Sequence, residues 1–177
     1  LLSSIIVFTG TFASWQLKPL TKEYFLWFTL LSTGVYGFFI STDLFTMFMF
    51  YEVALIPMYL LIGVWGSGRK EYSAMKLTLM LMGGSALLIL GLLGIYYFNG
   101  IYSGNYTFEL TTIAANHCIP GHIQNIFFPF IFIGFGVLGA LFPFHTWSPD
   151  GHASAPTAVS MLHAGVLMKL GGYGCYL

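Results

Sequence analysis

The stretch from Leu44 to Trp65 is an apolar run that holds one charged residue, Glu52. A helix needs roughly 20 apolar residues to cross a bilayer, and this run is long enough to do so. Within the bilayer the backbone must satisfy its own hydrogen bonds, so such a run can only be a helix. Across the chain, 57% of residues are hydrophobic and 7% are charged, whereas a soluble domain carries about 25% charged residues. The sequence therefore predicts an all-α, polytopic membrane helix bundle.

Hydropathy and helix-breaking residues divide the chain into about six transmembrane segments. These are Leu1–Gln16, Tyr24–Ser41, Leu44–Trp65, Tyr72–Phe98, Ile126–Phe144 and Ser154–Leu177. The polar stretch Asn99–Asn125 contains no Lys or Arg and is expected to be an extramembrane loop. The chain starts at Leu1 and stops inside a hydrophobic run. We therefore expect residues 1–177 to form a single transmembrane domain that is a fragment of a larger protein.

Basic residues orient the predicted bundle. Lys18 and Lys22 lie in the first connection, and Arg69 and Lys70 lie in the third. If all six segments span, both connections share one side, and the positive-inside rule places that side in the cytoplasm or its equivalent. The segment 145–152 is then expected on the same side. The net charge of zero gives no indication of a nucleic-acid partner.

Among the residues of this chain, Glu52 most strongly indicates a functional site within the membrane. An unpaired, ionised carboxylate at the centre of a spanning helix costs several kcal/mol, of the order of 3. Glu52 must therefore be neutral, paired or beside a wet cavity. Pro57 removes a backbone donor and is expected to kink the helix near Glu52. The alternative is a protonated glutamic acid that hydrogen-bonds a neighbouring helix for packing.

Three further ionisable side chains lie in apolar segments: Lys76, Lys169 and His163. Lys76 is near the start of its segment, where a long side chain can also reach the interface. Lys169 lies well inside its segment and needs an anion or the loss of its proton. His163 lies six residues earlier, and histidine titrates near neutral pH. A core histidine that only hydrogen-bonds a neighbour is the alternative for His163.

The stretch from Phe142 to Thr157 contains three prolines, so the fifth segment is expected to break near Pro143, at the membrane edge. Non-helical backbone beside water would suit a proton entry half-channel. His145, Asp150 and His152 match no known metal site, and Trp147 is expected to anchor the interface. Gly134–Gly139 fits G-x-G-x-x-G, but it lies in an apolar segment and follows no strand, so close helix packing explains it better than dinucleotide binding.

Three stretches of the sequence resemble antiporter-like membrane subunits of respiratory complex I (NADH–quinone oxidoreductase), of the chain M (chain 4) type. They read FYEVALIPMYLLIGVWG, FPFHTWSPDGHASAPTAVSMLHAG and GVLMKLGGYG. The resemblance covers nearly the whole chain, and it implies about the third to eighth helices of a fourteen-helix antiporter-like fold.

The resemblance also implies roles for individual residues. Glu52 matches the family's intramembrane glutamate, and Lys76 and Lys169 match lysines of the sixth and eighth helices. His145 and His152 match histidines after the break in the seventh helix. Where the family usually has a lysine that partners the glutamate, this sequence has Leu138, and Ala140 replaces a proline. Lys76 or His163 could compensate, or pumping could be altered or lost.

The resulting hypothesis is a proton-translocating subunit of complex I, with Glu52, Lys76, Lys169, His145 and His163 on the proton path. It predicts no cofactor in this chain: NADH, flavin, iron–sulfur clusters and quinone belong to partner subunits in the membrane and the peripheral arm. The expected location is a bacterial inner membrane rather than that of an organelle. The alternatives are a subunit of a cation/proton antiporter or of a membrane-bound hydrogenase, or a structural subunit with inactive carriers.

Overall fold

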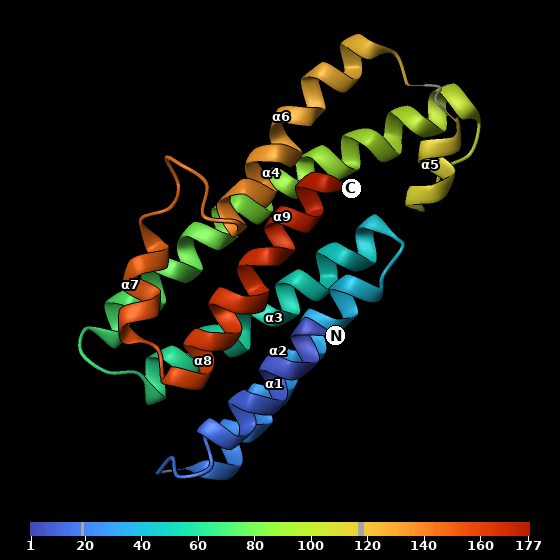
Figure 1. The fold of residues 1–177 in the computed structure, drawn as a ribbon. Helices are drawn as coiled ribbons and strands as arrows, with labels where there is room; N and C mark the ends of the chain where they lie inside the picture. Colours follow the sequence, from blue (N-terminus) through green and yellow to red (C-terminus); the bar gives the residue numbers. More distant parts are fainter. Residues whose placement is uncertain (19, 117–118) are drawn as a thin grey trace.

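The computed structural model describes residues 1–18, 20–116 and 119–177, and these residues form helices joined by short connections (Figure 1). The helices run in chain order as α1 Leu2–Ala13, α2 Thr21–Ile40, α3 Leu44–Trp65, α4 Lys70–Ser103, α5 Leu110–Asn116, α6 Gly121–Leu138, α7 Trp147–Ser154, α8 Thr157–Leu162, the π-helical turn η1 His163–Leu167, and α9 Met168–Tyr176. The predicted all-α bundle is confirmed.

Within the described residues, three helices are long and apolar enough to cross a membrane: α3, α4 and α6. The six expected segments, with the fifth broken near Pro143, correspond to α1, α2, α3, α4, α6 with α7, and the stretch from α8 to α9. α1 has 12 residues, or about 18 Å of rise. The last segment is helical without a gap from Thr157 to Tyr176 and contains one π turn, His163–Leu167. Pro57 lies inside α3 without ending it.

The predicted loop 99–125 is shorter in the structure, because α4 continues to Ser103 and α6 begins at Gly121. Asn99 is buried and its side-chain amide donates to the Asn105 carbonyl, which ties the end of α4 to the chain that follows it. α4 has 34 residues, about 51 Å of rise, and so exceeds the roughly 30 Å hydrocarbon core. Residues 117 and 118 lie outside the described residues.

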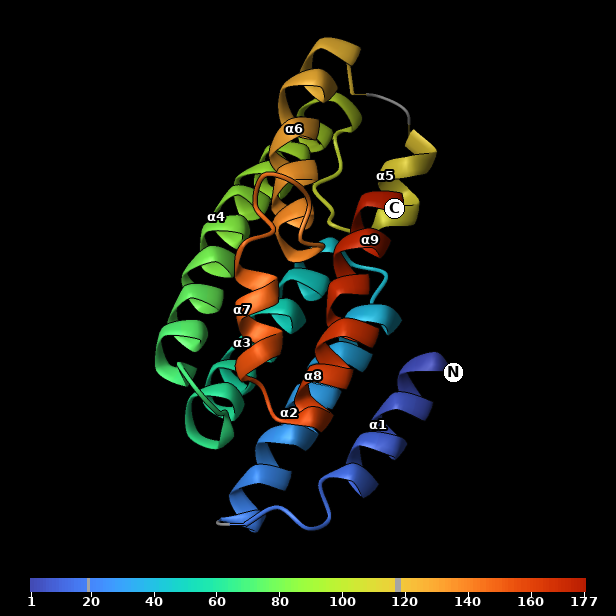
Figure 2. The same cartoon turned by 60° about the vertical axis from the view of Figure 1, so that its left-hand side comes forward.

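The two ends of the bundle match the predicted grouping of connections. The turns that join α3 to α4 and α7 to α8 lie at one end, near the start of α2, and α5 lies at the other end (Figures 1 and 2). At the α5 end, Leu44 N–H donates to Phe108 O and Leu110 N–H donates to Thr42 O. The Thr112 and Thr111 hydroxyls donate to the Glu109 carboxylate and hold its pKa below the usual range. Which end faces the cytoplasm stays a prediction.

Close contact between α4 and α6 is built on small residues. A Cβ added at Gly134 would lie 2.8 Å from Leu88 Cβ, and one added at Gly84 would lie 2.8 Å from Val137 Cβ. Glycine removes this obstacle and lets the two helices approach. The packing explanation for the G-x-G-x-x-G match is therefore confirmed.

The break after α6 lies partway along α4 (Figure 2). α6 ends at Leu138 and α7 begins at Trp147. The intervening side chains from Leu141 to Thr146 are exposed. α7 then runs to the end of the bundle that holds the α3–α4 turn, where Ser67 N–H donates to Ser154 O over 2.8 Å. The predicted break is confirmed, and its expected position at the membrane edge stays a prediction.

α6 ends in a Schellman motif with alanine at the left-handed position. Leu141 N–H donates to Gly136 O at 2.8 Å and Ala140 N–H donates to Val137 O at 3.1 Å, as this motif requires. Ala140 has a φ of 54°. A left-handed conformation brings Cβ close to the following carbonyl oxygen and costs about 1–2 kcal/mol for a residue other than glycine.

We expect Ala140→Gly to raise the free energy of unfolding by about 0.5–1 kcal/mol, because glycine relieves the strain but gives the unfolded chain more freedom. Ala155→Gly is the control, since Ala155 has an ordinary φ of −71°, and it should lower stability. Thermal unfolding of the purified full-length protein in detergent measures both. Destabilisation by both variants would contradict the prediction.

Candidate functional site

A polar cluster joins α7 to the start of α4, and its centre is an ion pair. The Lys76 ammonium donates to the Asp150 carboxylate with an Nζ–Oδ2 distance of 2.6 Å. The two side chains are 24% and 43% exposed, so solvent reaches the pair in the isolated chain. Beside it, the Ser154 hydroxyl donates to the Ser73 hydroxyl over 2.7 Å. Because Lys76 pairs with Asp150, it is not the partner of Glu52 that the sequence hypothesis considered.

Two histidines stack between α7 and the last helical segment. The rings of His152 and His163 have centroids 4.4 Å apart, and the Trp147 indole lies on the other side of His163 at 5.3 Å. His152 Nδ1 also shares a hydrogen bond with the Ser160 hydroxyl at 3.0 Å. Four polar or aromatic side chains from α7, α8 and the π turn therefore form one contact network.

His163 is the most buried member of this network. Its side chain is 1% exposed, and its Nδ1 has no hydrogen-bond partner among the described residues. An unsatisfied buried nitrogen is unfavourable, because the group loses water and gains nothing in return. His163 also sits at the first position of the π turn His163–Leu167, and π turns inside α-helices are frequent at functional sites. The π turn is a feature that the sequence did not predict.

Trp147 is fully buried, so its expected role as an interface anchor is wrong. The indole N–H donates to the Val137 carbonyl at 3.2 Å, close to the end of α6. The Val137 carbonyl also accepts from the Ala140 N–H, so the indole supplies a second hydrogen bond at this helix end. Trp147 therefore holds α7 against α6 across the break.

Glu52 lies apart from this cluster, on α3. Its Oε1 atom is buried and has no hydrogen-bond partner among the described residues. It lines a groove of about 340 Å³ between α3 and α4, and Lys76 is not in the lining. The neighbouring Tyr51 hydroxyl donates instead to the Leu81 carbonyl at 2.9 Å.

Lys169 and His145 are exposed in the structure. Lys169 lies on α9, just after the π turn, and unlike the buried His163 it is exposed. His145 lies in the break, where its ring is 5.7 Å from that of Phe142. The five predicted site residues are therefore distributed over the bundle. Two of them contact α7: Lys76 through Asp150, and His163 through the rings of Trp147 and His152.

Leu138, at the position of the lysine that the resemblance implies, is 1% exposed and belongs to the hydrophobic core. The sequence does not predict the role of Asp150 as the ion-pair partner of Lys76. Its pattern with His145 and His152 indicates only a possible metal ligand. In the sequence, Asp150 stands out only as a carboxylate in a proline-rich segment. Lys76 is 74 residues away, so the sequence does not identify it as the partner.

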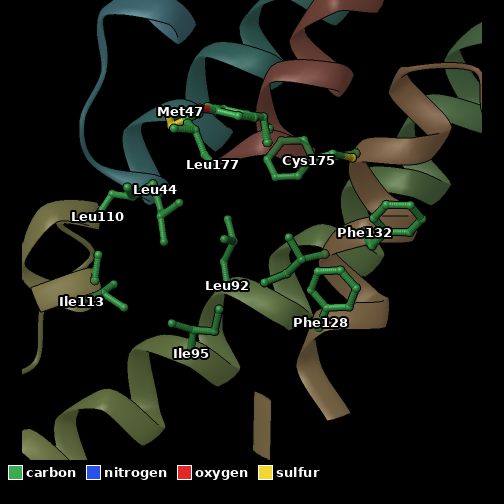
Figure 3. Close-up of a pocket in the computed structure, with 15 residues that line it drawn as sticks. Leu44, Met47, Leu92, Ile95, Leu110, Ile113, Phe128, Phe132, Cys175 and Leu177 are labelled. Atoms are coloured by element: carbon green, nitrogen blue, oxygen red, sulfur yellow. The ribbon is translucent and has the colours of Figure 1, made fainter. Parts of the chain in front are cut away.

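A separate apolar cavity of about 430 Å³ lies between α3, α4, α5, α6 and α9. Figure 3 shows aliphatic and aromatic side chains converging on it, among them Leu92, Ile95 and Phe128. No Asp, Glu, Lys, Arg or His lines it, and its polar side chains are Cys175 and Tyr176. Among the described residues, no three His, Cys, Asp or Glu side chains gather in a metal-binding arrangement.

Comparison with known proteins gives a family match over most of the chain. A family model described as "NADH:quinone oxidoreductase/Mrp antiporter, TM" matches residues 41–177. Subunit M of the NADH-quinone oxidoreductase of Rickettsia bellii is 42% identical over 158 residues, which are 89% of this chain and 31% of that protein. Chain 4 of the chloroplastic NAD(P)H-quinone oxidoreductase of Vitis vinifera is 39% identical over 174 residues, 98% of this chain and 34% of that protein.

Solved structures share the same fold. A chain of respiratory complex I from Thermus thermophilus with bound NADH superposes with a TM-score of 0.83 and 24% identity, over 97% of this chain and 35% of that chain. A chain of the Mrp complex from Dietzia sp. superposes with a TM-score of 0.79 and 20% identity, over 99% of this chain and 32% of that chain. This chain spans about a third of the length of these relatives.

Proposed function

Since this chain belongs to the NADH:quinone oxidoreductase/Mrp antiporter transmembrane family, we propose that it is part of a proton-translocating membrane subunit of an NADH–quinone oxidoreductase. The observation that carries the proposal is a set of ionisable side chains on apolar helices around a broken helix. The Lys76–Asp150 ion pair and the stacked His152 and His163 are its centre. Ionisable groups inside a membrane are costly, and they commonly mark ion or proton pathways.

In this proposal Glu52, Lys76, His163, His145 and Lys169 carry protons, and Asp150 joins them as the counter-ion of Lys76. Electron transfer takes place in partner subunits, where flavin, iron–sulfur clusters and quinone are bound, and this chain holds no redox centre. A change in the pairing of one charged group shifts the protonation of its neighbours. Movement of α7 would separate Lys76 from Asp150 and so release or capture a proton.

The broken helix supports such a movement. α7 has eight residues and connects to α6 through residues 139–146, of which 141–146 are exposed, rather than through a continuous helix. On the α4 side its polar contacts are the ion pair and the Ser154–Ser73 hydrogen bond, and the buried Trp147 at its start holds it to the end of α6. The ion pair and the hydrogen bond to α4 can break and be replaced by other polar contacts while α4 and α6 stay folded.

The proposed setting is a bacterial inner membrane, with other membrane subunits and a peripheral arm as partners. A cation/proton antiporter subunit is the second candidate, and the similarity to the Mrp complex chain favours it. Purification of the native complex separates the two. Co-purification of flavin and iron–sulfur subunits supports the oxidoreductase, and their absence together with sodium transport supports the antiporter.

Glu52→Gln tests the function. It keeps the shape of the side chain but removes its charge and its exchangeable proton, so we expect proton pumping by the full complex in vesicles to fall at least tenfold. Glu71→Gln is the control, because Glu71 is exposed near the start of α4. Quenching of a pH-sensitive dye measures pumping, with assembly checked on native gels. Normal pumping by an assembled Glu52→Gln complex would remove Glu52 from the pathway.

A further inference from the structure

The surroundings of His163 are complete within this chain. Its side chain is 1% exposed and lies between the Trp147 ring at 5.3 Å and the His152 ring at 4.4 Å. Gly151 closes a further side, because a Cβ added there would lie 3.7 Å from His163 Cε1. A group elsewhere in a longer protein could not reach the ring unless α7 moved. Of these neighbours, His152 is the one with an ionisable side chain, and it is therefore the direct candidate for proton exchange with His163.

The stacked geometry of the two histidine rings prevents a hydrogen bond between them. The ring planes lie at 26° to each other, so the rings are face to face. A ring N–H bond lies in the plane of its ring and is directed past a stacked neighbour, whereas a hydrogen bond needs the N–H to point at the acceptor. In agreement with this, His163 Nδ1 is buried and has no partner among the described residues. A proton can pass directly between the rings once His152 has turned.

A hydrogen bond from α8 fixes the His152 ring in this stacked position. Ser160 Oγ lies 3.0 Å from His152 Nδ1. The Ser160 N–H donates to the Pro156 carbonyl at 2.8 Å, which places the serine on the first turn of α8. A hydroxyl can donate to a neutral imidazole or accept from a protonated one, so it can hold the ring in either state. His152 is also partly exposed, and it is therefore the member of the pair that water and groups beyond α7 can reach.

Few other charged groups face the histidine pair. α1, α6, α8 and the π turn contain no Asp, Glu, Lys or Arg. α4 and α7 present Lys76 and Asp150, which neutralise each other. Glu52 of α3 lines the α3–α4 groove, and Lys169 of α9 is exposed. Like charges on rings 4.4 Å apart repel each other, so protonation of one ring disfavours protonation of the other. The pair therefore holds at most one positive charge at a time.

We propose that Ser160 is a positioning residue that controls proton exchange between His152 and His163. Its hydroxyl holds His152 in the stacked position, and exchange requires this hydrogen bond to be given up for one between a His152 ring N–H and His163 Nδ1. In the step itself the N–H bond of protonated His152 breaks, the Nδ1–H bond of His163 forms, and the positive charge moves to His163, whose own proton is on Nε2. The role of the pair in pumping rests on the proposed function, whereas the exchange between the two rings does not.

Nitrogen NMR of the full-length protein in lipid nanodiscs, with isotope-labelled histidine, tests the role of Ser160. The His152 signals are those that disappear in His152→Asn. In Ser160→Ala we expect the through-space contact between a His152 ring N–H and His163 Nδ1 to grow at least about threefold, because one hydrogen bond that opposes it is lost. Ser160→Thr keeps a hydroxyl and should restore the wild-type spectrum. Ser32→Ala is the control, since it removes a buried hydroxyl that donates to the Phe28 carbonyl on α2 and should leave the His152 signals unchanged.

Three spectra would overturn the proposal: His152 signals that are unchanged in Ser160→Ala, signals that change without a contact to His163, or a Ser160→Thr spectrum like that of Ser160→Ala. Thermal unfolding checks that each variant is folded. If Ser160→Ala does not fold, Ser160→Cys takes its place, because a thiol fills a similar volume but is a weak hydrogen-bonding group.

Proton pumping by the native complex in vesicles gives the second measurement. His152→Gln should lower it at least about tenfold, because the side chain loses the ring that carries the proton. His122→Gln is the control, since His122 is exposed at the start of α6 and should leave pumping unchanged. Normal pumping by an assembled His152→Gln complex would overturn the role of the pair in pumping. A wild-type complex that pumps no protons would contradict the proposed function instead, and the spectra would still decide whether Ser160 controls the exchange.

Discussion

Gly171→Ala is expected to lower the free energy of unfolding by about 3 kcal/mol, the upper end of the range of about 1–3 kcal/mol for overpacking a core. Gly171 is buried on α9, against the end of α6. A Cβ there would lie 2.4 Å from Gly139 N and 2.5 Å from Phe135 O. These atoms are backbone, and no side-chain rotation can relieve the contact. α9 must therefore move away from α6.

Gly172→Ala is the matched control, because the adjacent glycine has no atom within 4 Å of its added Cβ. Alanine favours the helix over glycine by up to about 1 kcal/mol, so this variant should be neutral or stabilising. Unfolding of the full-length protein in detergent, followed with a thiol-reactive dye, measures both variants. Equal stability of the two variants would show that α9 does not pack on α6 in this way.

Trp147→Ala is expected to lower the free energy of unfolding by about 3–5 kcal/mol, the range for removal of a large buried aromatic side chain. Trp147 is 0% exposed, it contacts the His163 ring, and its indole N–H satisfies the Val137 carbonyl. The substitution leaves a cavity between α6 and α7, and the Val137 carbonyl keeps only its hydrogen bond from the Ala140 N–H. We also expect α7 to lose its fixed position, which would weaken the Lys76–Asp150 pair.

Trp15→Ala is the control for the loss of a tryptophan. Trp15 is 73% exposed, so its replacement should change stability by less than about 1 kcal/mol. Trp147→Phe adds a second comparison, because it keeps most of the buried area and removes the N–H donor. An intermediate loss of about 1–3 kcal/mol is expected for it. A Trp147→Ala variant as stable as the Trp15→Ala variant would contradict the packing described here.

Helix type and approximate bounds could be predicted from the sequence, because hydropathy, proline and glycine act locally. The limits of α3 agree with the apolar run Leu44–Trp65, and the break near Pro143 follows from prolines that cannot continue a helix. The extent of α4 could not be predicted in this way. Gly100 and Asn99 favour a loop by composition, but tertiary contacts with the segment after Ser103 keep them helical and buried.

The candidate site was predicted as individual residues but not as an arrangement. Glu52, Lys76, Lys169 and His163 are conspicuous because each is an ionisable group in an apolar segment. Their partners depend on how helices distant in the sequence pack. Lys76 and Asp150 are 74 residues apart, and nothing in the local sequence of either one identifies the other.

The sequence by itself determined that this chain is a membrane helix bundle with ionisable groups inside it, because the cost of exposing backbone or charge to lipid leaves few alternatives. Only the tertiary structure decided which charges meet. It paired Lys76 with Asp150, stacked His152 on His163, and left Glu52 facing an open groove. Pairing is a matter of distance between helices, and the local sequence of one helix does not specify that distance.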